Sequence, residues 1–164
     1  MLVPMIISFA FVLAVVVICI AKPNAGRIFL GFFFLAMALG VNGPFTFGNP
    51  QAYLDYASGA LIPLYRDLAI SVVTLNPMAF GILLMAFEIA VGLLLLHKQK
   101  SVKIGLVGTM LFLIGIAPLS WVQIPWLGLI VAEVYLFRRE FDRSFLEVLR
   151  SKSNKGISGV SNKT

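Results

Sequence analysis

Long apolar segments constrain this 164-residue chain more than any other feature. A helix needs about 20 apolar residues to cross a hydrocarbon core of about 30 Å. The composition agrees, because hydrophobic residues make up 60% of the chain and charged residues only 12%, roughly half of what a soluble domain carries. We therefore predict an all-α membrane protein with a single transmembrane bundle over residues 1–150. Its spans are expected at 3–21, 26–42, 77–96, 104–119 and 121–137.

The segments between and after the spans have a different character. The link between the second and third spans is rich in turns and tyrosines, which favour the membrane interface, so interfacial helices are expected at 50–72, divided by Pro63. After the last span, apolar residues at helical spacing alternate with arginines and predict an amphipathic helix over 139–150 on the inner leaflet. Residues 151–164 are expected to form a disordered cytoplasmic tail.

The basic residues predict the orientation. With five spans, twelve of the thirteen lysines and arginines lie on one side, and only Arg66 lies on the other. By the positive-inside rule, the protein is a multi-pass cell-membrane protein with its N-terminus outside and its C-terminus in the cytoplasm. Loss of the first helix as a signal peptide would satisfy the rule equally, but no basic residue precedes its apolar run, so we expect it to be retained. Since these charges flank spans, the bilayer is the expected partner and nucleic acid is not.

Glu88 lies in the middle of the third span, where a charged side chain costs at least about 2.5 kcal/mol. It shares a helix face with Gly81 and Gly92, and small residues mark places where another helix comes close, so Glu88 is expected to point into the bundle. No basic residue occurs at the same depth on the other spans. Desolvation therefore favours a neutral carboxyl group that donates a hydrogen bond.

Two hypotheses for Glu88 remain open. It lines a small ligand pocket open to the outer side, joined by Tyr65, Arg66 and Asp67 where the external segment folds into the bundle, or it serves only helix packing. For Glu133, one and a half turns inside the cytoplasmic boundary, we predict a structural ion pair with Arg27.

Several other features indicate architecture rather than chemistry. Asn42 and Asn76 are interpreted as caps at the outer span ends. Tyr53, Tyr56 and Tyr65 are interpreted as interfacial anchors, with stacking on a quinone ring as the alternative. One cysteine and one histidine exclude an intramolecular disulfide and paired haem ligands, and no metal site or catalytic constellation is expected. The small residues that predict close helix packing or homo-oligomerisation are Gly81, Gly92, Gly105, Gly108 and Gly115.

One further pattern concerns residues 27–137 as a whole. Arg27 opens a span and is followed by the run Gly-Phe-Phe-Phe-Leu at 31–35, a polar and aromatic link, the run Glu88-Ile-Ala-Val-Gly92-Leu-Leu-Leu-Leu, a basic turn and a Gly-rich span. This pattern resembles the DoxX-like family of small bacterial and archaeal membrane proteins. The resemblance implies a four-helix transmembrane bundle, to which this chain adds one N-terminal transmembrane helix. Some members are similar to the small subunit of thiosulfate:quinone oxidoreductase or belong to complexes that handle oxidative stress.

The resemblance and Glu88 together favour an accessory subunit of a membrane redox system. Such a subunit would position a quinone or a similar amphipathic molecule for a membrane oxidoreductase, with no intrinsic cofactor and no catalysis of its own. Two alternatives stay open: a small oligomeric transporter or channel that uses Glu88 as a proton or substrate site, and a structural or lipid-interacting protein. The chain shows no inverted repeat of the kind that many transporters display.

Overall fold

All regular structure in the computed structural model, which describes residues 2–150, is helical. Four helical segments are long and apolar enough to cross a membrane: Leu2–Ala21, Pro23–Gly48, Pro77–Leu96 and Lys100–Leu119. A shorter apolar segment, Ile124–Phe137, follows the last of them. By length and composition, these are the helices of a multi-pass integral membrane protein. The tail expected at 151–164 lies outside the described residues.

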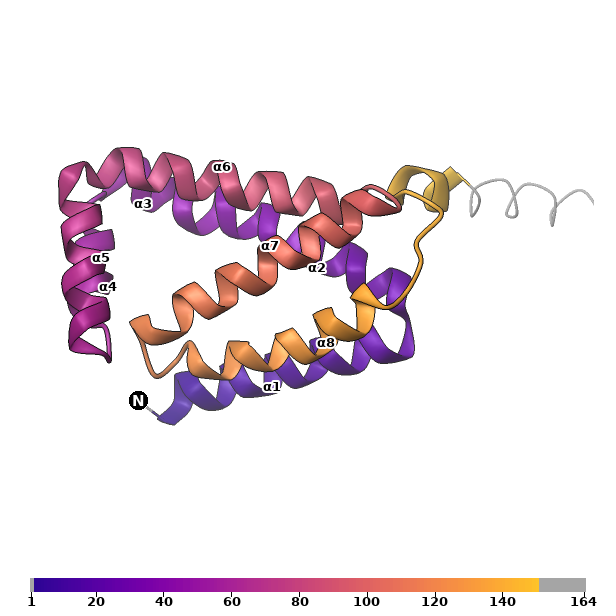
Figure 1. The fold of residues 1–164 in the computed structure, drawn as a ribbon, viewed down its shortest axis with the longest axis horizontal. Helices are drawn as coiled ribbons and strands as arrows, with labels where there is room; N and C mark the ends of the chain where they lie inside the picture. Colours follow the sequence, from indigo (N-terminus) through magenta and orange to yellow (C-terminus); the bar gives the residue numbers. More distant parts are fainter. Residues whose placement is uncertain (1, 151–164) are drawn as a thin grey trace, which may run out of the picture.

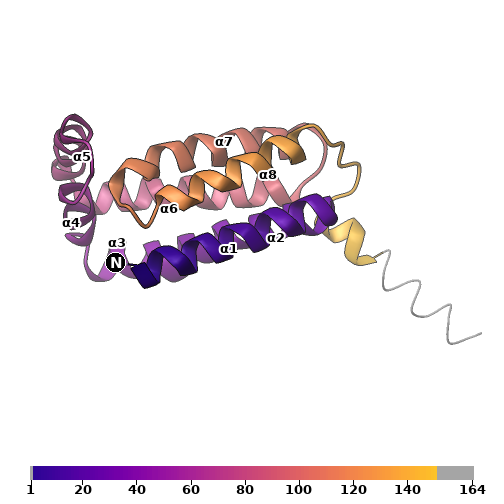
Figure 2. The same cartoon turned by 90° about the horizontal axis from the view of Figure 1, so that it is seen from below.

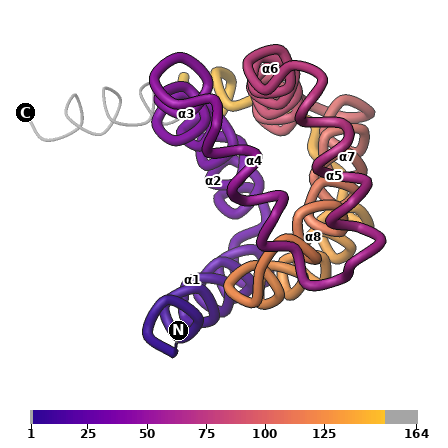
Figure 3. Tube along the Cα trace, turned by 90° about the vertical axis from the view of Figure 1, so that its left-hand side faces the viewer, coloured from indigo at the N-terminus to yellow at the C-terminus, as the bar shows by residue number. Residues whose placement is uncertain are grey.

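The long helices form a ring around a central space (Figures 1 and 3). In chain order they are α1 (Leu2–Ala21), α2 (Pro23–Met37), α6 (Pro77–Leu96), α7 (Lys100–Ile116) and α8 (Gly128–Phe137). Each packs against the next, and α8 returns to pack along α1, which closes the ring (Figure 2). At one end α1 and α2 lie close together, whereas at the other end the helices spread apart (Figure 1).

The second membrane helix is longer than the sequence predicts. After Met37 the chain makes one π-helical segment, η1 (Ala38–Asn42), and continues directly into α3 (Gly43–Gly48). Within this wide turn the Gly43 N–H donates to the carbonyl five residues back, at Ala38. Pro44 has no N–H, and its ring would clash with the carbonyl four residues earlier, so an ordinary α-turn is disfavoured here. The span therefore ends six residues beyond the expected end, Asn42.

Two short helices, α4 (Ala52–Ser58) and α5 (Pro63–Leu75), cross the end of the ring where the helices spread apart (Figures 1 and 3). Pro63 is the first residue of α5, where its missing N–H costs nothing, and this confirms the predicted division of the segment. The link between the two helices is tied to the bundle, because the Leu61 N–H donates to the Pro118 carbonyl at 2.8 Å. Pro118 lies in η2 (Ala117–Leu119), at the end of α7.

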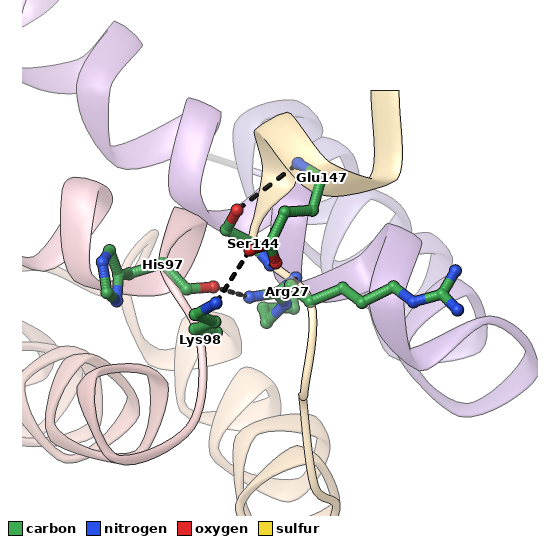
Figure 4. A network of polar contacts seen from close by, with 6 residues as sticks. Arg27, His97, Lys98, Ser144 and Glu147 are labelled. Carbon is green, nitrogen blue, oxygen red and sulfur yellow. Dashed lines mark hydrogen bonds and ion pairs between the residues drawn. The ribbon is translucent and has the colours of Figure 1, made fainter. Parts of the chain in front are cut away.

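The opposite end of the ring is closed by Arg27, which is fully buried (Figure 4). Its guanidinium donates to the backbone carbonyls of Leu95, His97 and Arg143, and it lies 4.9 Å from the centre of the Phe141 ring. Leu95 and His97 are at the C-terminal end of α6, where carbonyls lack helical partners and the helix dipole favours a cation. A single side chain thus joins α2, α6 and the segment after α8.

The segment after α8 differs from the predicted continuous helix over 139–150. Residues 138–144 are not helical, and the helix begins at 145 and runs to 150. A capping box defines this start, because the Ser144 N–H donates to the Glu147 carboxylate at 2.8 Å and the Glu147 N–H lies 3.4 Å from the Ser144 hydroxyl (Figure 4). Lys98 also bonds Glu147, at 2.8 Å. Phe141, which the prediction placed on an amphipathic face, is buried in the core instead.

Four of the five glycines predicted at helix contacts are at close approaches. A Cβ on Gly92 would lie 2.9 Å from the Gly31 carbonyl oxygen, and Cβ atoms on Gly105 and Gly108 would lie within 3.1 Å of α6 side chains. Gly81 contacts side chains of α3 and α4. Gly115 differs, since a Cβ there would meet nothing within 4 Å.

Candidate functional site

A cavity of about 620 Å³ lies inside the ring, and residues of α4 and α5 form part of its wall. Its wall is mostly apolar and draws on α1, α2, α6, α7, α8 and the two covering helices. Glu88 lies on this wall and is 1% exposed, which confirms that its side chain points into the bundle. The polar residues that line the cavity are Ser8, Asn42, Tyr53, Tyr56, Tyr65, Glu88 and Gln123.

Glu88 is held by a side-chain amide. Asn42 Nδ2 donates to Glu88 Oε2 at 2.7 Å, and both residues are buried. The hydrogen bond to Asn42 uses Oε2 alone, and no bond from another group among residues 2–150 reaches Oε1, so Oε1 remains available to a molecule in the cavity. Within the described part of the chain no Lys, Arg or His lines the cavity, so none of these residues gives the carboxyl group a counter-charge there. Glu88 and Asn42 therefore form a fixed polar point on an apolar wall.

A second layer of hydrogen bonds fixes Asn42. The Tyr53 hydroxyl lies 3.1 Å from the Asn42 carbonyl oxygen and 3.3 Å from Asn42 Oδ1, and it also bonds the Thr46 hydroxyl at 2.8 Å. Burial raises the pKa of Tyr53, so its hydroxyl remains protonated and can donate. We call Glu88, Asn42, Tyr53 and Thr46 the Glu88 network.

Local geometry in two helices makes this network. The wide π-turn of η1 contains Asn42, and π-turns inside α-helices are common at functional sites. Across from it, Gly81 leaves the space that the network fills, since a Cβ there would lie 2.4 Å from Thr46 Oγ1 and 2.7 Å from Tyr53 Cε2. A residue with a side chain at position 81 would displace both hydroxyl-bearing side chains.

Aromatic rings form much of the remaining wall. Phe33 and Trp126 are stacked, with ring centres 5.5 Å apart and planes at 27°. Phe34 meets Phe112 edge to face at 5.7 Å. All four line the cavity. Such a surface suits a flat or branched apolar body, while the Glu88 network supplies hydrogen bonds at one point of the wall.

The three residues expected to join Glu88 separate in the structure. Tyr65 lines the cavity, and its hydroxyl donates to the Gly115 carbonyl, which ties α5 to the end of α7. Burial raises the pKa of Tyr65. Arg66 and Asp67 face outward as an exposed pair 3.6 Å apart, with side chains 42% and 72% exposed, and neither lines the cavity. The helical turn explains the difference, because consecutive residues of α5 cannot share one face.

The structural ion pair predicted between Arg27 and Glu133 does not form. Arg27 bonds backbone carbonyls instead, and both carboxyl oxygens of the buried Glu133 lack hydrogen-bond partners in the described part of the chain. Thr109 bonds the Leu106 carbonyl of its own helix. Glu133 lies outside the cavity wall, so it gives a second membrane carboxyl group against which Glu88 can be compared.

Sequence reasoning missed most of the Glu88 network. Asn76 caps α6 as predicted, by accepting from the Ala79 N–H at 3.0 Å, but Asn42 does not cap a helix. Tyr53 is buried at 7% exposure rather than anchored at an interface. The signal in the sequence was the Gly-Pro pair after Asn42, which can continue a membrane helix through a π-turn as well as end it.

Comparison with known proteins gives no family, because no family model, curated protein or solved structure matches the chain. The DoxX-like resemblance therefore stays a prediction. Among the described residues, no group of three or more His, Cys, Asp or Glu is placed to hold a metal ion.

Proposed function

We propose that this integral membrane protein binds an amphipathic molecule, with an isoprenoid quinone as the leading candidate, in the cavity that α4 and α5 help to line. As an accessory subunit of a membrane redox system, it presents that molecule to an oxidoreductase partner. The observation that carries the proposal is Glu88, which is buried, bonded to Asn42 on one side and open to a mostly apolar cavity of about 620 Å³ on the other. The DoxX-like resemblance adds a family in which quinone-linked membrane subunits occur.

The chemistry of the cavity supports this ligand class. A quinone head group needs a hydrogen bond to a carbonyl oxygen and apolar or aromatic surroundings for its ring and tail. A neutral Glu88 carboxyl group supplies the donor, and the walls near Phe33, Phe112 and Trp126 supply the surroundings. A small transporter would use the same carboxyl group for proton movement, so the tests below include a flux measurement.

Trp126 offers a direct binding assay. It lines the cavity, whereas Trp121, the other tryptophan, is 56% exposed and does not. In a Trp121→Phe background, a short-chain benzoquinone added to detergent-solubilised protein should quench the Trp126 fluorescence saturably. Glu88→Leu should raise the half-saturating quinone concentration about tenfold. This corresponds to the loss of about 1.4 kcal/mol of binding free energy, as expected for one hydrogen bond. Glu88→Gln keeps a hydrogen-bond donor and should raise the half-saturating quinone concentration far less.

Glu133→Gln is the matched control, because it makes the same change at a buried carboxyl group outside the cavity, and it should leave quenching unchanged. Thermal unfolding of each variant separates binding from stability. Quenching that is linear in quinone concentration, or equal in wild type and Glu88→Leu, would contradict the proposal. In that case, proton flux that depends on Glu88 in reconstituted vesicles would support a transporter. Purification from the native membrane then tests whether an oxidoreductase accompanies the protein.

A further inference from the structure

Gln123 is a polar residue of the cavity wall that the Glu88 network does not use. It lies in the link between α7 and α8, next to η3 (Ile124–Leu127). Its amide oxygen, Oε1, is buried and has no hydrogen-bond partner within residues 2–150. Gln123 therefore lines the same space as Glu88, with a side chain whose amide oxygen has no partner in the described chain.

The large majority of buried polar side-chain atoms have a hydrogen-bond partner in protein or ordered water, and the described chain supplies none to Gln123 Oε1. The other buried unpartnered side-chain atoms in the described chain belong to Arg27 and Glu133. Neither of those residues lines the cavity. Of these three residues, Gln123 is therefore the one that also lines the cavity, as Glu88 does.

Gln123 and Glu88 come from different walls of the cavity. Glu88 projects from α6, while Gln123 precedes η3 and α8, which pack against α1 and α7 (Figures 1 and 3). The rest of the cavity wall is mostly apolar and aromatic, and includes Phe112 and Trp126. A molecule that meets both polar residues must therefore carry two separate hydrogen-bonding groups on an apolar body.

We propose that Gln123 is the second anchor of the cavity and that the ligand is a two-ended molecule, with one polar group at Glu88 and another at Gln123. This inference rests on the proposed function, since it assigns a second contact to the same ligand. A carboxamide both donates and accepts, so Gln123 holds either a carbonyl oxygen or a hydroxyl group. Gln123 therefore accommodates a ring with two oxygens, whether the ring is oxidised or reduced. A ring with only one oxygen lacks the group that Gln123 would bind.

The test compares two ligands that differ by one polar group. Isothermal titration calorimetry under reducing conditions measures the affinity of detergent-solubilised protein for a decyl-substituted hydroquinone, with two ring hydroxyls, and for the matching decylphenol, with one. Wild type should bind the hydroquinone about tenfold more tightly. Gln123→Met removes the amide at nearly constant volume, and should bring the two affinities to within about twofold while decylphenol binding stays unchanged. Ile124→Val, at the neighbouring position and outside the cavity wall, should behave as wild type.

Glu88→Leu separates failure of this inference from failure of the proposed function. If Glu88→Leu weakens both ligands while Gln123→Met leaves the preference for hydroquinone intact, the cavity binds its ligand but Gln123 is no anchor, and the inference is overturned. If Gln123→Met weakens both ligands equally, its role is general packing, and the inference is overturned as well. If neither ligand binds wild type, the proposed function itself fails, and the inference falls with it. Gln123→Leu repeats the measurement where Gln123→Met does not fold.

Discussion

Gly81 is the position at which one missing side chain makes the Glu88 network possible. A methyl group there would lie 2.4 Å from Thr46 Oγ1 and 2.7 Å from Tyr53 Cε2, well inside van der Waals contact. Both neighbours are buried and bonded to each other, so neither can move without breaking the bonds that hold Asn42. We predict that Gly81→Ala lowers the free energy of unfolding by about 1–3 kcal/mol, as overpacking does in cores. Unfolding in mixed micelles measures this change.

Gly115→Ala is the matched control, because Gly115 is also a helical glycine of the bundle but a Cβ there would meet nothing within 4 Å. Replacing glycine by alanine in a helix should then be neutral, or should stabilise by up to about 1 kcal/mol. Equal effects of the two substitutions would contradict the assigned role of Gly81.

Arg27 and Glu133 show what individual residues do not reveal in a sequence. The sequence predicts an ion pair between them because it shows two opposite side-chain charges at a similar depth and shows nothing of the backbone groups nearby. In the structure the partners of Arg27 are backbone carbonyls of Leu95, His97 and Arg143, which every residue carries and no pattern marks. A helix end without partners for its carbonyls is the physical signal, and it becomes visible only when the position of the C-terminal end of α6 is known.

At the scale of elements, Glu147 caps the helix from 145 to 150 and joins it to Lys98. The stability of this cap and of the contact with Lys98 therefore depends on pH. Hydrogen bonds from Lys98 and from the Ser144 N–H hold the pKa of Glu147 at about 2. A free glutamate has a pKa of about 4.3. A carboxyl group whose pKa is lowered by its partners stabilises the state in which those bonds are made, here the helix docked on Lys98. This stabilisation is fully present above pH 4.3, roughly the pKa of free glutamate, and is lost as the pH falls towards about 2.

We therefore predict that the capped helix remains docked at neutral pH and loosens in this acidic window. The Val148 N–H, which donates to the Ser144 carbonyl at 3.0 Å, reports the change through its amide chemical shift in micelles. Glu147→Gln should abolish the transition. Glu140→Gln, on the non-helical segment just before, should leave it as in wild type. A transition that persists in Glu147→Gln would exclude Glu147 as its source.

The helices themselves follow closely from apolar length, whereas their ends do not. The third predicted span, 77–96, coincides with α6 because Asn76 and Pro77 define its start by capping chemistry. The second and last spans deviate at Gly-Pro and Pro-containing turns. At Pro44 the chain continues through a π-turn, and before α8 it passes through η3, so that Ile124–Phe137 is shorter than the expected 121–137. Proline forbids one hydrogen bond but does not determine which alternative the chain adopts.

At the scale of the whole molecule, the ring explains why the cavity could be anticipated only in part. Glu88 was expected to face inward because it lies on a glycine face, and this depends on one helix alone. Asn42, Tyr53 and Gln123 reach the same space from three other elements. Their convergence depends on how η1, α4 and the α7–α8 link are arranged around the ring, and hydrophobic periodicity carries no information about that arrangement.

The ring also has two chemically different ends, and these predict how it sits in a membrane. Basic residues near the Arg27 end flank α2, α6, α7 and α8, whereas Arg66 is the one basic residue on the α4 and α5 side among residues 2–150. From the positive-inside rule we predict that the Arg27 end lies in the cytoplasm and that the cavity, with its two covering helices, lies towards the outside. A ligand would then enter from the outer leaflet or the outer side.

Thiol labelling tests this orientation, because the native Cys19 is fully buried and should stay unlabelled. Ser58→Cys is exposed on α4, and we predict that a membrane-impermeant maleimide labels it in intact cells. Asp142→Cys, exposed beyond α8, should be labelled only after the membrane is permeabilised. The reverse pattern would place the cavity on the cytoplasmic side, so that a redox partner would meet the ligand there. Labelling of both positions in intact cells would contradict the prediction that Ser58 and Asp142 lie on opposite sides of the membrane. It would also contradict the crossing of the membrane by five helices, on which the orientation depends.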